Sequence, residues 1–279
     1  MIALVNFADK NFRKKQKWNT FSGKFFGKFD KVFEFNKEDI DKRILELNKE
    51  NLKYEEKGAG NYFWKPHIIL KALKELKDGD FLMYSDSGAV FIKSVVPMVR
   101  HMQSKNKNIL CYKLPFIEKQ WTKRDAFLLM DSDSLLYTDS PQIMATFLLV
   151  KKNKESLNFI KRWQDYSSDS RVLSDDVNVM GKDNYPEFIE HRHDQSILSL
   201  LCKKEKNILI EGDISDYGRY PYRYLKNVKQ DCLFDEKLIH NPKDNIFRGT
   251  VLCNRKNNPF IYICKYIVRS VFYKFGIKK

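Results

Sequence analysis

Two stretches of the chain place clustered Asp and Ser residues directly after an apolar run. The first is "GDFLMYSDSGAVF" at residues 79–91, and the second is "RDAFLLMDSDSLLY" at residues 124–137. Each predicts a buried strand that delivers a carboxylate to the mouth of a site, because a rigid strand end holds such a side chain in place. Hard oxygen ligands of this kind suit magnesium or manganese, and such an ion can neutralise a diphosphate.

The two stretches differ in spacing and in context. On spacing alone, Asp131 and Asp133 are the nearer match to an Asp-x-Asp metal motif. However, "MDSDSLLYTDSPQ" is dense in turn formers, which predicts a turn. Asp86 instead follows an expected helix, tight turn and strand, and Gly88 allows a ligand to approach the backbone closely. We therefore predict the site at Asp86, Ser87 and Gly88.

The elements around these residues predict an α/β chain in a single domain. Hydrophobic patterning predicts strands at residues 2–8, 31–35, 81–85 and 143–152, and helices at residues 36–52, 66–76, 155–166 and 194–204. Residues 10–28 carry seven Lys or Arg and no acidic residue, and we expect a loop there. That loop is either solvated or faces phosphate after the first strand, where open α/β sheets bind ligands. Residues 205–258 are rich in turn formers and indicate a loop-heavy region.

Composition narrows the class of protein further. With 279 residues, 43% hydrophobic and 31% charged, the chain is globular and not disordered. Its net charge of +15 favours anionic partners such as nucleotide phosphates, nucleic acid or an acidic membrane surface. The five cysteines are odd in number and lack CxxC spacing, so neither a zinc site nor a disulfide framework is expected. The start lacks signal-peptide features, and a reducing cytoplasmic setting fits best.

The segment "PFIYICKYIVRSVFYKFGIKK" at residues 259–279 is aromatic, β-branched and basic, with no acidic residue. Two interpretations stay open for it. One is an ordinary terminal helix that packs on the core. The other is a peripheral contact with the inner face of the cell membrane, since Lys and Arg favour anionic lipid and aromatic side chains favour the interface.

The sequence "GAGNYFWKPHIILKALKELKDGDFLMYSDSG" at residues 58–88 resembles the signature of small bacterial GT-A-type glycosyltransferases from capsule and O-antigen clusters. Further matches are "QWTKRD" at 120–125, "QIMATFLLVKK" at 142–152 and "FIEHRHDQSILSLL" at 188–201. The resemblance covers about residues 1–205. It implies a single-domain GT-A-like fold, a Rossmann-like mixed sheet flanked by helices. We expect this domain to occupy residues 1–258, and the composition of residues 259–279 marks them as a separate tail.

The same resemblance implies an activity. The enzyme would move a sugar from a nucleotide-sugar, expected to be a UDP-sugar, to a hydroxyl of a surface glycan. The acceptor would be lipid-linked, and no nucleic acid is expected as a partner. The metal-binding acidic motif falls on Asp86, Ser87 and Gly88. Its third position is Gly and not Asp, so manganese or magnesium would rest on one carboxylate, the diphosphate and water.

The same resemblance implies functional roles for other residues, and each of these residues could instead have a purely structural role. Asp194 and Gln195 would lie at the reaction centre, where Asp194 acts as base or holds the donor sugar; otherwise Asp194 is a helix N-cap. His240 would complete the metal shell, or is a solvated loop histidine. Nucleotide-sugar contacts would come from residues that are otherwise core or surface residues: Asn6, Tyr62, Trp64, Lys65 and His193.

Two other classes of protein remain as alternatives. A sugar nucleotidyltransferase is also α/β and metal-dependent, but it would show a Gly-rich basic loop after strand one. The segment "NFADKNFRKKQ" has no Gly. A basic nucleic-acid-binding module would gather its Lys and Arg in one stripe with aromatic residues. Here the basic residues are spread through the whole chain.

Overall fold

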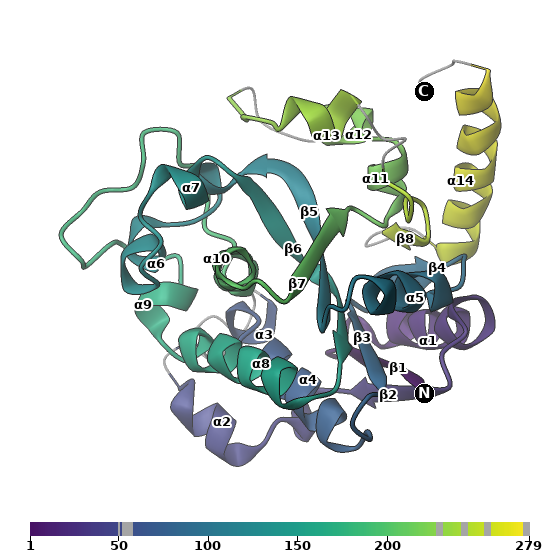
Figure 1. Ribbon diagram of the computed structural model, residues 1–279, viewed down its shortest axis with the longest axis horizontal. Helices are drawn as coiled ribbons and strands as arrows, with labels where there is room; N and C mark the ends of the chain where they lie inside the picture. The colour runs from purple at the N-terminus through teal and green to yellow at the C-terminus, as the bar shows by residue number, and fades with distance from the viewer. Residues whose placement is uncertain (50, 52–57, 227–230, 241–244, 254–257, 276–279) are drawn as a thin grey trace.

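The computed structural model describes residues 1–49, 51, 58–226, 231–240, 245–253 and 258–275. Figure 1 shows its arrangement. The strands are β1 (Ile2–Phe7), β2 (Lys31–Phe35), β3 (Phe81–Ser85), β4 (Ala89–Phe91), β5 (Ile109–Ile117), β6 (Pro141–Lys151), β7 (Ile208–Gly212) and β8 (Val251–Cys253). The helices are α1 (Arg13–Ser22), α2 (Lys42–Leu47), α3 (Gly58–Asn61), α4 (Trp64–Lys74), α5 (Val96–Ser104), α6 (Arg124–Leu129), α7 (Leu135–Thr138), α8 (Lys154–Ser167), α9 (Ser170–Leu173), α10 (Asp194–Lys204), α11 (Asp216–Arg219), α12 (Tyr222–Lys226), α13 (Glu236–His240) and α14 (Pro259–Lys274).

Six strands form one mixed sheet in the order β2-β1-β3-β6-β5-β7. The pairs β2–β1, β1–β3 and β5–β7 are parallel, and β6 runs antiparallel to both β3 and β5. Strands β1, β3, β5 and β7 therefore end at the same edge of the sheet. In open α/β sheets, this carboxyl edge is where ligands bind.

Helices cover both faces of the sheet, because each buried strand points alternate side chains to opposite faces. Ala3, Leu82 and Cys111 contribute to a core shared with α4, α8 and α10. Leu4, Met83 and Leu110 contribute to a second core shared with α5. In Figure 1, α4, α8 and α10 lie on one side of the strands and α5 lies on the other. The expected single α/β domain with a mixed sheet is confirmed.

Most of the expected elements are confirmed. The helix expected over residues 36–52 is shorter, with a 3-10 turn at Lys37–Asp39 and α2 in its described part, and residues 50 and 52 lie outside the described residues. Two further expectations are wrong. Strands β2 and β3 and helix α10 have the bounds that the pattern predicts. Residues 10–28 are not a loop: they form α1 and a π-helical turn, η1 (Gly23–Gly27). Residues Arg124–Leu129 form α6 and not a strand, so Asp131 and Asp133 follow a helix instead of a strand end.

Helix α1 was not predicted because its buried face is polar and its exposed face is aromatic. Its buried side chains are the polar Gln16, Asn19 and Ser22, and its aromatic side chains face outward. A helix of this kind shows no apolar stripe for sequence analysis to detect.

The described residues between β7 and α14 form short elements around the two-stranded pair β4–β8. Helix α14 follows this pair and packs through Tyr262 and Tyr266 against Val90, Tyr220 and Leu252. The last four residues of the predicted tail, 276–279, lie outside the described residues. Among the described helices, none is both long enough and apolar enough to cross a bilayer.

Candidate active site

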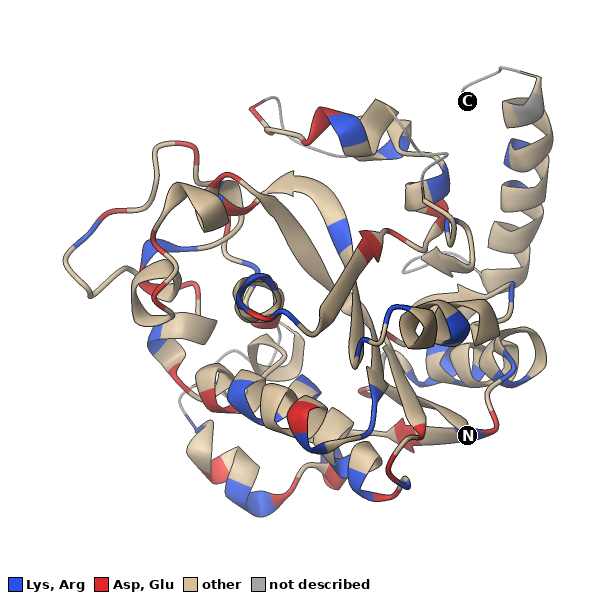
Figure 2. Cartoon of the chain, in the orientation of Figure 1, with Lys and Arg blue, Asp and Glu red and all other residues tan. Residues whose placement is uncertain are grey.

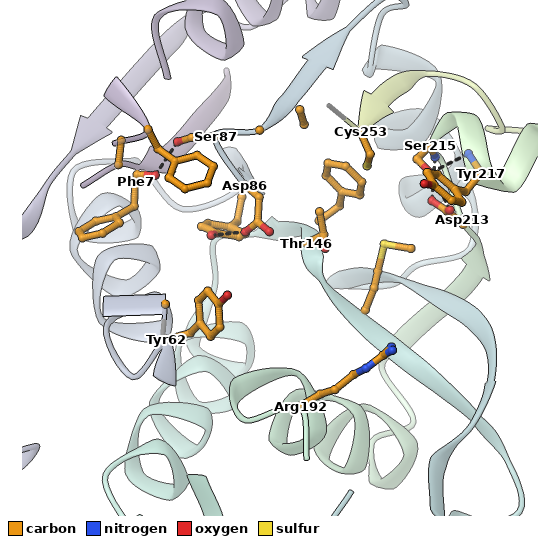
Figure 3. Close-up of a pocket in the computed structure, with 18 of the residues that line it drawn as sticks. Phe7, Tyr62, Asp86, Ser87, Thr146, Arg192, Asp213, Ser215, Tyr217 and Cys253 are labelled. Atoms are coloured by element: carbon orange, nitrogen blue, oxygen red, sulfur yellow. Dashed lines mark hydrogen bonds between the residues drawn. The ribbon is translucent and has the colours of Figure 1, made fainter. Parts of the chain in front are cut away.

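A cavity of about 950 Å³ opens at the carboxyl edge of the sheet. Phe7 ends β1, Asp86 follows β3 and Asp213 follows β7, and all three side chains line the cavity. Figure 3 shows Asp86 near the middle, with Phe7 and Tyr62 towards one end and Asp213, Ser215 and Tyr217 at the other. A cavity of this size can hold a nucleotide-sized ligand.

Asp86 sits in a tight turn between β3 and β4. Its backbone N–H donates to the Thr146 carbonyl at 3.0 Å, and its own carbonyl accepts from the Ala89 N–H at 3.0 Å. The Tyr84 hydroxyl donates to Oδ1 of Asp86 at 2.6 Å. Ser87 follows and donates its hydroxyl hydrogen bond to the Phe7 carbonyl, which joins β1 to this turn. Asp86, Ser87 and Gly88 all line the cavity.

Lys65 connects Asp86 to Asp194. The Nζ of Lys65 lies 2.6 Å from Oδ2 of Asp194 and 3.7 Å from Oδ1 of Asp86, and it donates to the Ala145 carbonyl at 3.2 Å. Burial alone would lower the pKa of Lys65, but the two carboxylates raise it above its usual value. Burial raises the pKa of Asp194 to about 6, against the opposing effect of Lys65.

This arrangement changes two expectations. Lys65 and Asp194 are buried and are not among the residues that line the cavity. Asp194 is also not an N-cap: it is the first residue of α10, and His193 occupies the cap position. The Lys65–Asp194 ion pair instead holds Asp86 in place, because the ammonium group of Lys65 lies between the carboxylates of Asp86 and Asp194.

The "GAGNY" segment forms a left-handed turn at one end of the cavity. All five residues have positive φ angles, from 52° at Ala59 to 93° at Gly60. Consecutive left-handed residues cost about 1–2 kcal/mol each for residues other than Gly. A Cβ on Gly58 would lie 2.4 Å from the Tyr62 ring, so Gly is required there. Such strain in a backbone that lines a cavity indicates a functional constraint.

Tyr62 and Trp64 both line the cavity, but they differ in exposure. Tyr62 is half-buried, and the Nζ of Lys65 lies 5.1 Å from its ring centroid. Trp64 is only 5% exposed. Its ring stacks on Phe7 with centroids 3.8 Å apart, and its Nε1 donates to the Gly58 carbonyl at 2.9 Å. Trp64 therefore acts mainly as a core residue under the turn, since Phe7 occupies one face of the ring.

In the "HRHDQ" block, Arg192 lines the cavity, and the other four residues lie outside the cavity lining. His193 is buried outside the cavity lining, and its Nδ1 donates to the Leu173 carbonyl at 2.9 Å. His191 donates through Nε2 to the Val172 carbonyl at 2.9 Å, and burial keeps its pKa well below the usual value. Gln195 accepts from the Ala145 N–H at 3.2 Å and donates to Oε1 of Gln142 at 2.8 Å. The structure therefore places His193 and Gln195 as supports.

Asn6 and His240 also do not reach the cavity lining. Asn6 is fully buried; it donates to Oδ1 of Asn19 at 2.8 Å and accepts from Nε2 of Gln16 at 3.0 Å. It therefore fastens β1 to α1. His240 is exposed on α13 and lies 2.9 Å from Glu236 of the same helix. Its place on the surface gives it no contact with Asp86.

Sequence analysis missed the other half of the cavity. Arg192 lines it and stacks over the Trp121 ring, with 3.7 Å between the guanidinium carbon and the ring centroid. Asp213 is buried and accepts from the Ser215 backbone N–H and hydroxyl, each at 2.7 Å. The remaining missed residues of this end are Ser215, Tyr217, Arg223, Tyr224, Cys253 and Tyr262. Apart from Tyr262 on α14, they come from short elements or the turns beside them, and the only signal was the unusual density of Tyr and Arg in "DYGRYPYRYL".

Asp131 and Asp133 lie outside the cavity lining. Asp133 pairs with the Arg124 Nε at 2.9 Å and accepts from the Tyr185 hydroxyl at 2.6 Å. These contacts explain the lowered pKa of Asp133, whose burial alone would raise it. The segment stabilises the loop around α6, in agreement with the predicted turn.

A divalent ion fits this site only if the substrate supplies most of its ligands. Among the described residues, no three His, Cys, Asp or Glu side chains lie close enough together to hold a metal ion. Asp86 offers one partly exposed carboxylate at the centre of the cavity. Magnesium and manganese accept such sites, in which one carboxylate is joined by substrate phosphates and water.

Comparisons with known proteins indicate the type of fold. No protein family matches the chain, and no curated protein sequence matches it. Among solved structures, the bifunctional glycosyltransferase WbbM has 11% identity and a TM-score of 0.50, over 92% of this chain and 46% of that one. The galactosyltransferase LgtC with donor and acceptor sugar analogs has 12% identity and a TM-score of 0.45, over 91% and 87%. A glycosyltransferase involved in glycosylation of the PBCV-1 major capsid has 10% identity and a TM-score of 0.47, over 96% and 98%.

The match to WbbM establishes the fold type. This chain spans about half the length of WbbM and shares its fold at low identity. WbbM is a bifunctional glycosyltransferase, and the fold shared with it is of the GT-A type. The chain is thus a mixed α/β domain with a GT-A-like fold, whose cavity lies at the carboxyl edge of the sheet.

Proposed function

We propose that this chain is a glycosyltransferase that moves a sugar from a nucleotide-sugar donor, a UDP-sugar, to a hydroxyl of a bacterial surface glycan. The observation that carries the proposal is the position of Asp86. Its carboxylate lies at the middle of a 950 Å³ cavity, at the carboxyl edge of a GT-A-like sheet. In this reaction the acceptor hydroxyl bonds to the anomeric carbon, the bond from that carbon to the diphosphate breaks, and the hydroxyl proton is released.

The two ends of the cavity support different roles. The end formed by Phe7, Ala59 and Tyr62 is mainly apolar and aromatic, which suits the base and ribose of a nucleotide. The other end carries Asp213 and Arg223 among tyrosines, which suits the hydroxyls of a glycan acceptor. We assign the donor to the first end and the acceptor to the second, so that the diphosphate lies beside Asp86.

Asp86 would hold a manganese or magnesium ion together with the diphosphate. Such an ion supplies positive charge that stabilises the departing nucleoside diphosphate. Lys65 keeps the Asp86 carboxylate in place, and Asp194 keeps Lys65 charged. We therefore propose Asp194 as a positioning residue in place of the base that sequence analysis expected. Gln195 and His193 support the same region from their backbone contacts.

The proposed acceptor is lipid-linked, which would bring the enzyme to the inner face of the membrane. Support comes from α14, whose Tyr262 lines the acceptor end of the cavity. The exposed side of α14 carries Ile261, Val268 and Val271. A helix with an apolar outer face and no acidic residue suits a peripheral membrane contact.

A donor-hydrolysis screen tests the proposal. The purified chain is incubated with UDP-, GDP- and CDP-sugars, with manganese or with a chelator, and release of nucleoside diphosphate is measured. We expect slow, metal-dependent hydrolysis of a UDP-sugar and stabilisation of the fold by UDP. Pyrophosphate release from UTP and a sugar phosphate would instead support a nucleotidyltransferase. Thermal stabilisation by an oligonucleotide alone would support a nucleic-acid-binding module.

A further inference from the structure

Four aromatic side chains form an exposed cluster on α1 and η1. We call Trp18, Phe21, Phe25 and Phe26 the aromatic cluster. Its rings contact one another in sequence: Trp18 and Phe21 have centroids 6.1 Å apart, Phe21 and Phe25 6.0 Å, and Phe25 and Phe26 4.9 Å. Phe21 is 56% exposed and Phe25 is 61% exposed. A contiguous apolar patch of this kind on a surface marks an interaction site.

Packing of the helix does not account for these exposed rings. Helix α1 is held to the sheet by its polar face, where Gln16 donates to the Phe35 carbonyl at 2.9 Å and Asn19 donates to the Ala89 carbonyl at 2.9 Å. The Ser22 hydroxyl accepts from the Phe91 N–H at 3.1 Å. The helix therefore faces the core with its amides and the solvent with its rings, which is the reverse of a surface helix in water.

Basic side chains surround the aromatic cluster. Lys14, Lys17, Lys24 and Lys28 are exposed on the same segment. The Nζ of Lys28 lies 5.8 Å from the Phe25 ring centroid. No Asp or Glu occurs between residues 10 and 29. Figure 2 shows blue and no red along α1. This surface therefore combines exposed aromatic rings with positive charges that no acidic residue of the same segment balances.

Helix α14 presents a second surface of the same character. Its exposed apolar side chains are Phe260, Ile261, Ile267, Val268, Val271 and Phe272, and exposed Phe275 directly follows it. The helix carries basic but no acidic residues. Both helices pack around β4: its Phe91 contacts Phe29 beside η1, and its Val90 lies in the core formed with Tyr262 and Tyr266. Figure 1 shows α1 and α14 on the same side of the molecule.

We propose that the aromatic cluster and the outer face of α14 together form a surface that docks on an anionic lipid bilayer. Aromatic rings insert at the level of the lipid headgroups, and the surrounding lysines attract anionic lipid. A second copy of this chain would place lysine against lysine, which disfavours a dimer through this surface. Exposed Ile261, Ile267, Val268 and Val271 on α14 would gain nothing beside a phosphate backbone, which disfavours nucleic acid. The inference rests on the proposed function only in giving the docking a purpose, access to a lipid-linked acceptor.

Vesicle cosedimentation tests the surface. We expect the full chain to bind phosphatidylglycerol vesicles and to bind pure phosphatidylcholine vesicles far less, with binding weakened by salt. Phe21→Ser/Phe25→Ser should weaken binding by about tenfold or more without changing the net charge. Lys14→Gln/Lys17→Gln/Lys24→Gln should remove the preference for anionic lipid.

A matched control uses exposed apolar residues elsewhere. Leu135 and Leu136 are 74% and 75% exposed on α7, on the opposite side of the view in Figure 1. Leu135→Ser/Leu136→Ser should leave vesicle binding unchanged. If this control weakens binding as much as Phe21→Ser/Phe25→Ser, or if the chain binds anionic vesicles with all variants alike, the proposed surface is wrong. Self-association that the Phe variants abolish, with no vesicle binding, would show a second copy as the occupant.

Trp18 provides a direct optical probe, because the other three tryptophans, Trp64, Trp121 and Trp163, are buried. Anionic vesicles should shift the fluorescence of the chain to shorter wavelength and protect it from acrylamide. Both effects should vanish in Trp18→Phe. A shift that persists in Trp18→Phe would contradict insertion of this segment.

Experiment can distinguish failure of the docking surface from failure of the proposed glycosyltransferase activity. UDP-sugar hydrolysis measured without vesicles should be unchanged in Phe21→Ser/Phe25→Ser. Hydrolysis without vesicle binding would overturn the docking surface and leave the glycosyltransferase. Vesicle binding that depends on the aromatic cluster, without any donor hydrolysis, would do the reverse.

Discussion

The Nζ of Lys65 lies 2.6 Å from Oδ2 of Asp194, and both side chains are almost fully buried. The same Nζ lies 3.7 Å from Oδ1 of Asp86, whose side chain reaches the cavity. The buried ammonium group of Lys65 thus interacts with the carboxylates of both Asp194 and Asp86. Asp86 can be held at a fixed place in the cavity because Lys65 is itself held by Asp194.

The first prediction concerns the stability of this pair. Lys65→Met should lower the free energy of unfolding by about 3–5 kcal/mol, because it leaves the Asp194 carboxylate buried without its cation. Lys65→Met/Asp194→Leu should recover most of that loss. Urea denaturation of both variants measures the effect.

Activity should behave differently from stability in the same variants. The double variant should stay inactive in donor hydrolysis, since nothing then holds Asp86. If the double variant hydrolyses donor at the normal rate, Lys65 and Asp194 have no positioning role.

The second prediction concerns pH. Because burial raises the pKa of Asp194 to about 6, the folded chain holds this proton more tightly than the unfolded chain does. The contribution of Asp194 to stability is therefore full below about pH 4 and falls as the pH rises to about 6. Above pH 6 it is constant. Asp194→Asn should remove this part of the pH dependence of unfolding.

Donor binding should show the opposite trend with pH. Below about pH 6, neutral Asp194 leaves Lys65 to pair with Asp86 alone, so that Asp86 is less available to a metal and diphosphate. The KM for the UDP-sugar should rise there. Asp194→Asn should show a high KM that no longer changes near pH 6, and an unchanged wild-type profile in the variant would rule out this coupling.

The third prediction concerns the left-handed turn. Gly58→Ala should destabilise the chain and weaken UDP binding, since its Cβ would lie 2.4 Å from the Tyr62 ring. Gly79→Ala is the matched control: Gly79 also has a positive φ, of 88°, but a Cβ there would meet nothing within 4 Å. The control should cost only about 1–2 kcal/mol of stability and leave UDP affinity intact. Calorimetry of UDP binding with both variants separates strain from the role of Tyr62, and equal affinities would contradict that role.

The fourth prediction concerns Trp64. Its 5% exposure and its stacking on Phe7 predict that Trp64→Ala loses about 3–5 kcal/mol of stability, as other large core truncations do. Trp64→Phe should keep most of the stability and of the UDP affinity. A stable Trp64→Ala protein with a specific loss of UDP binding would instead show that the indole stacks on the base.

Much of the fold could be predicted because its signals are local. The unbroken apolar run Phe81–Tyr84 predicts β3, and helical spacing of apolar residues predicts α4 and α10. The position of Asp86 follows from them, since the turn after β3 must lie at the carboxyl edge of the sheet. The GT-A-like fold was predicted from the resemblance of these same segments.

The rest depends on contacts between residues that are distant in sequence. Nothing local reveals that Lys65 pairs with Asp194 and stays out of the cavity. Helix α1 was missed because its buried side chains are Gln16, Asn19 and Ser22 instead of apolar residues. The acceptor end was missed because short elements such as α11 and β8 carry too few residues to show a period.

The most direct test of the account compares two acidic sites in one assay, hydrolysis of a UDP-sugar with manganese. Asp86→Asn removes the carboxylate at the centre of the cavity, whereas Asp131→Asn/Asp133→Asn changes the acidic pair outside it. Asp86→Asn should lower turnover by about 10³-fold, since a metal-held leaving group contributes several kcal/mol. The double variant should keep most of its turnover, with some loss of stability from the Arg124 and Tyr185 contacts of Asp133. An active Asp86→Asn protein beside an inactive but folded double variant would contradict the assignment of this site.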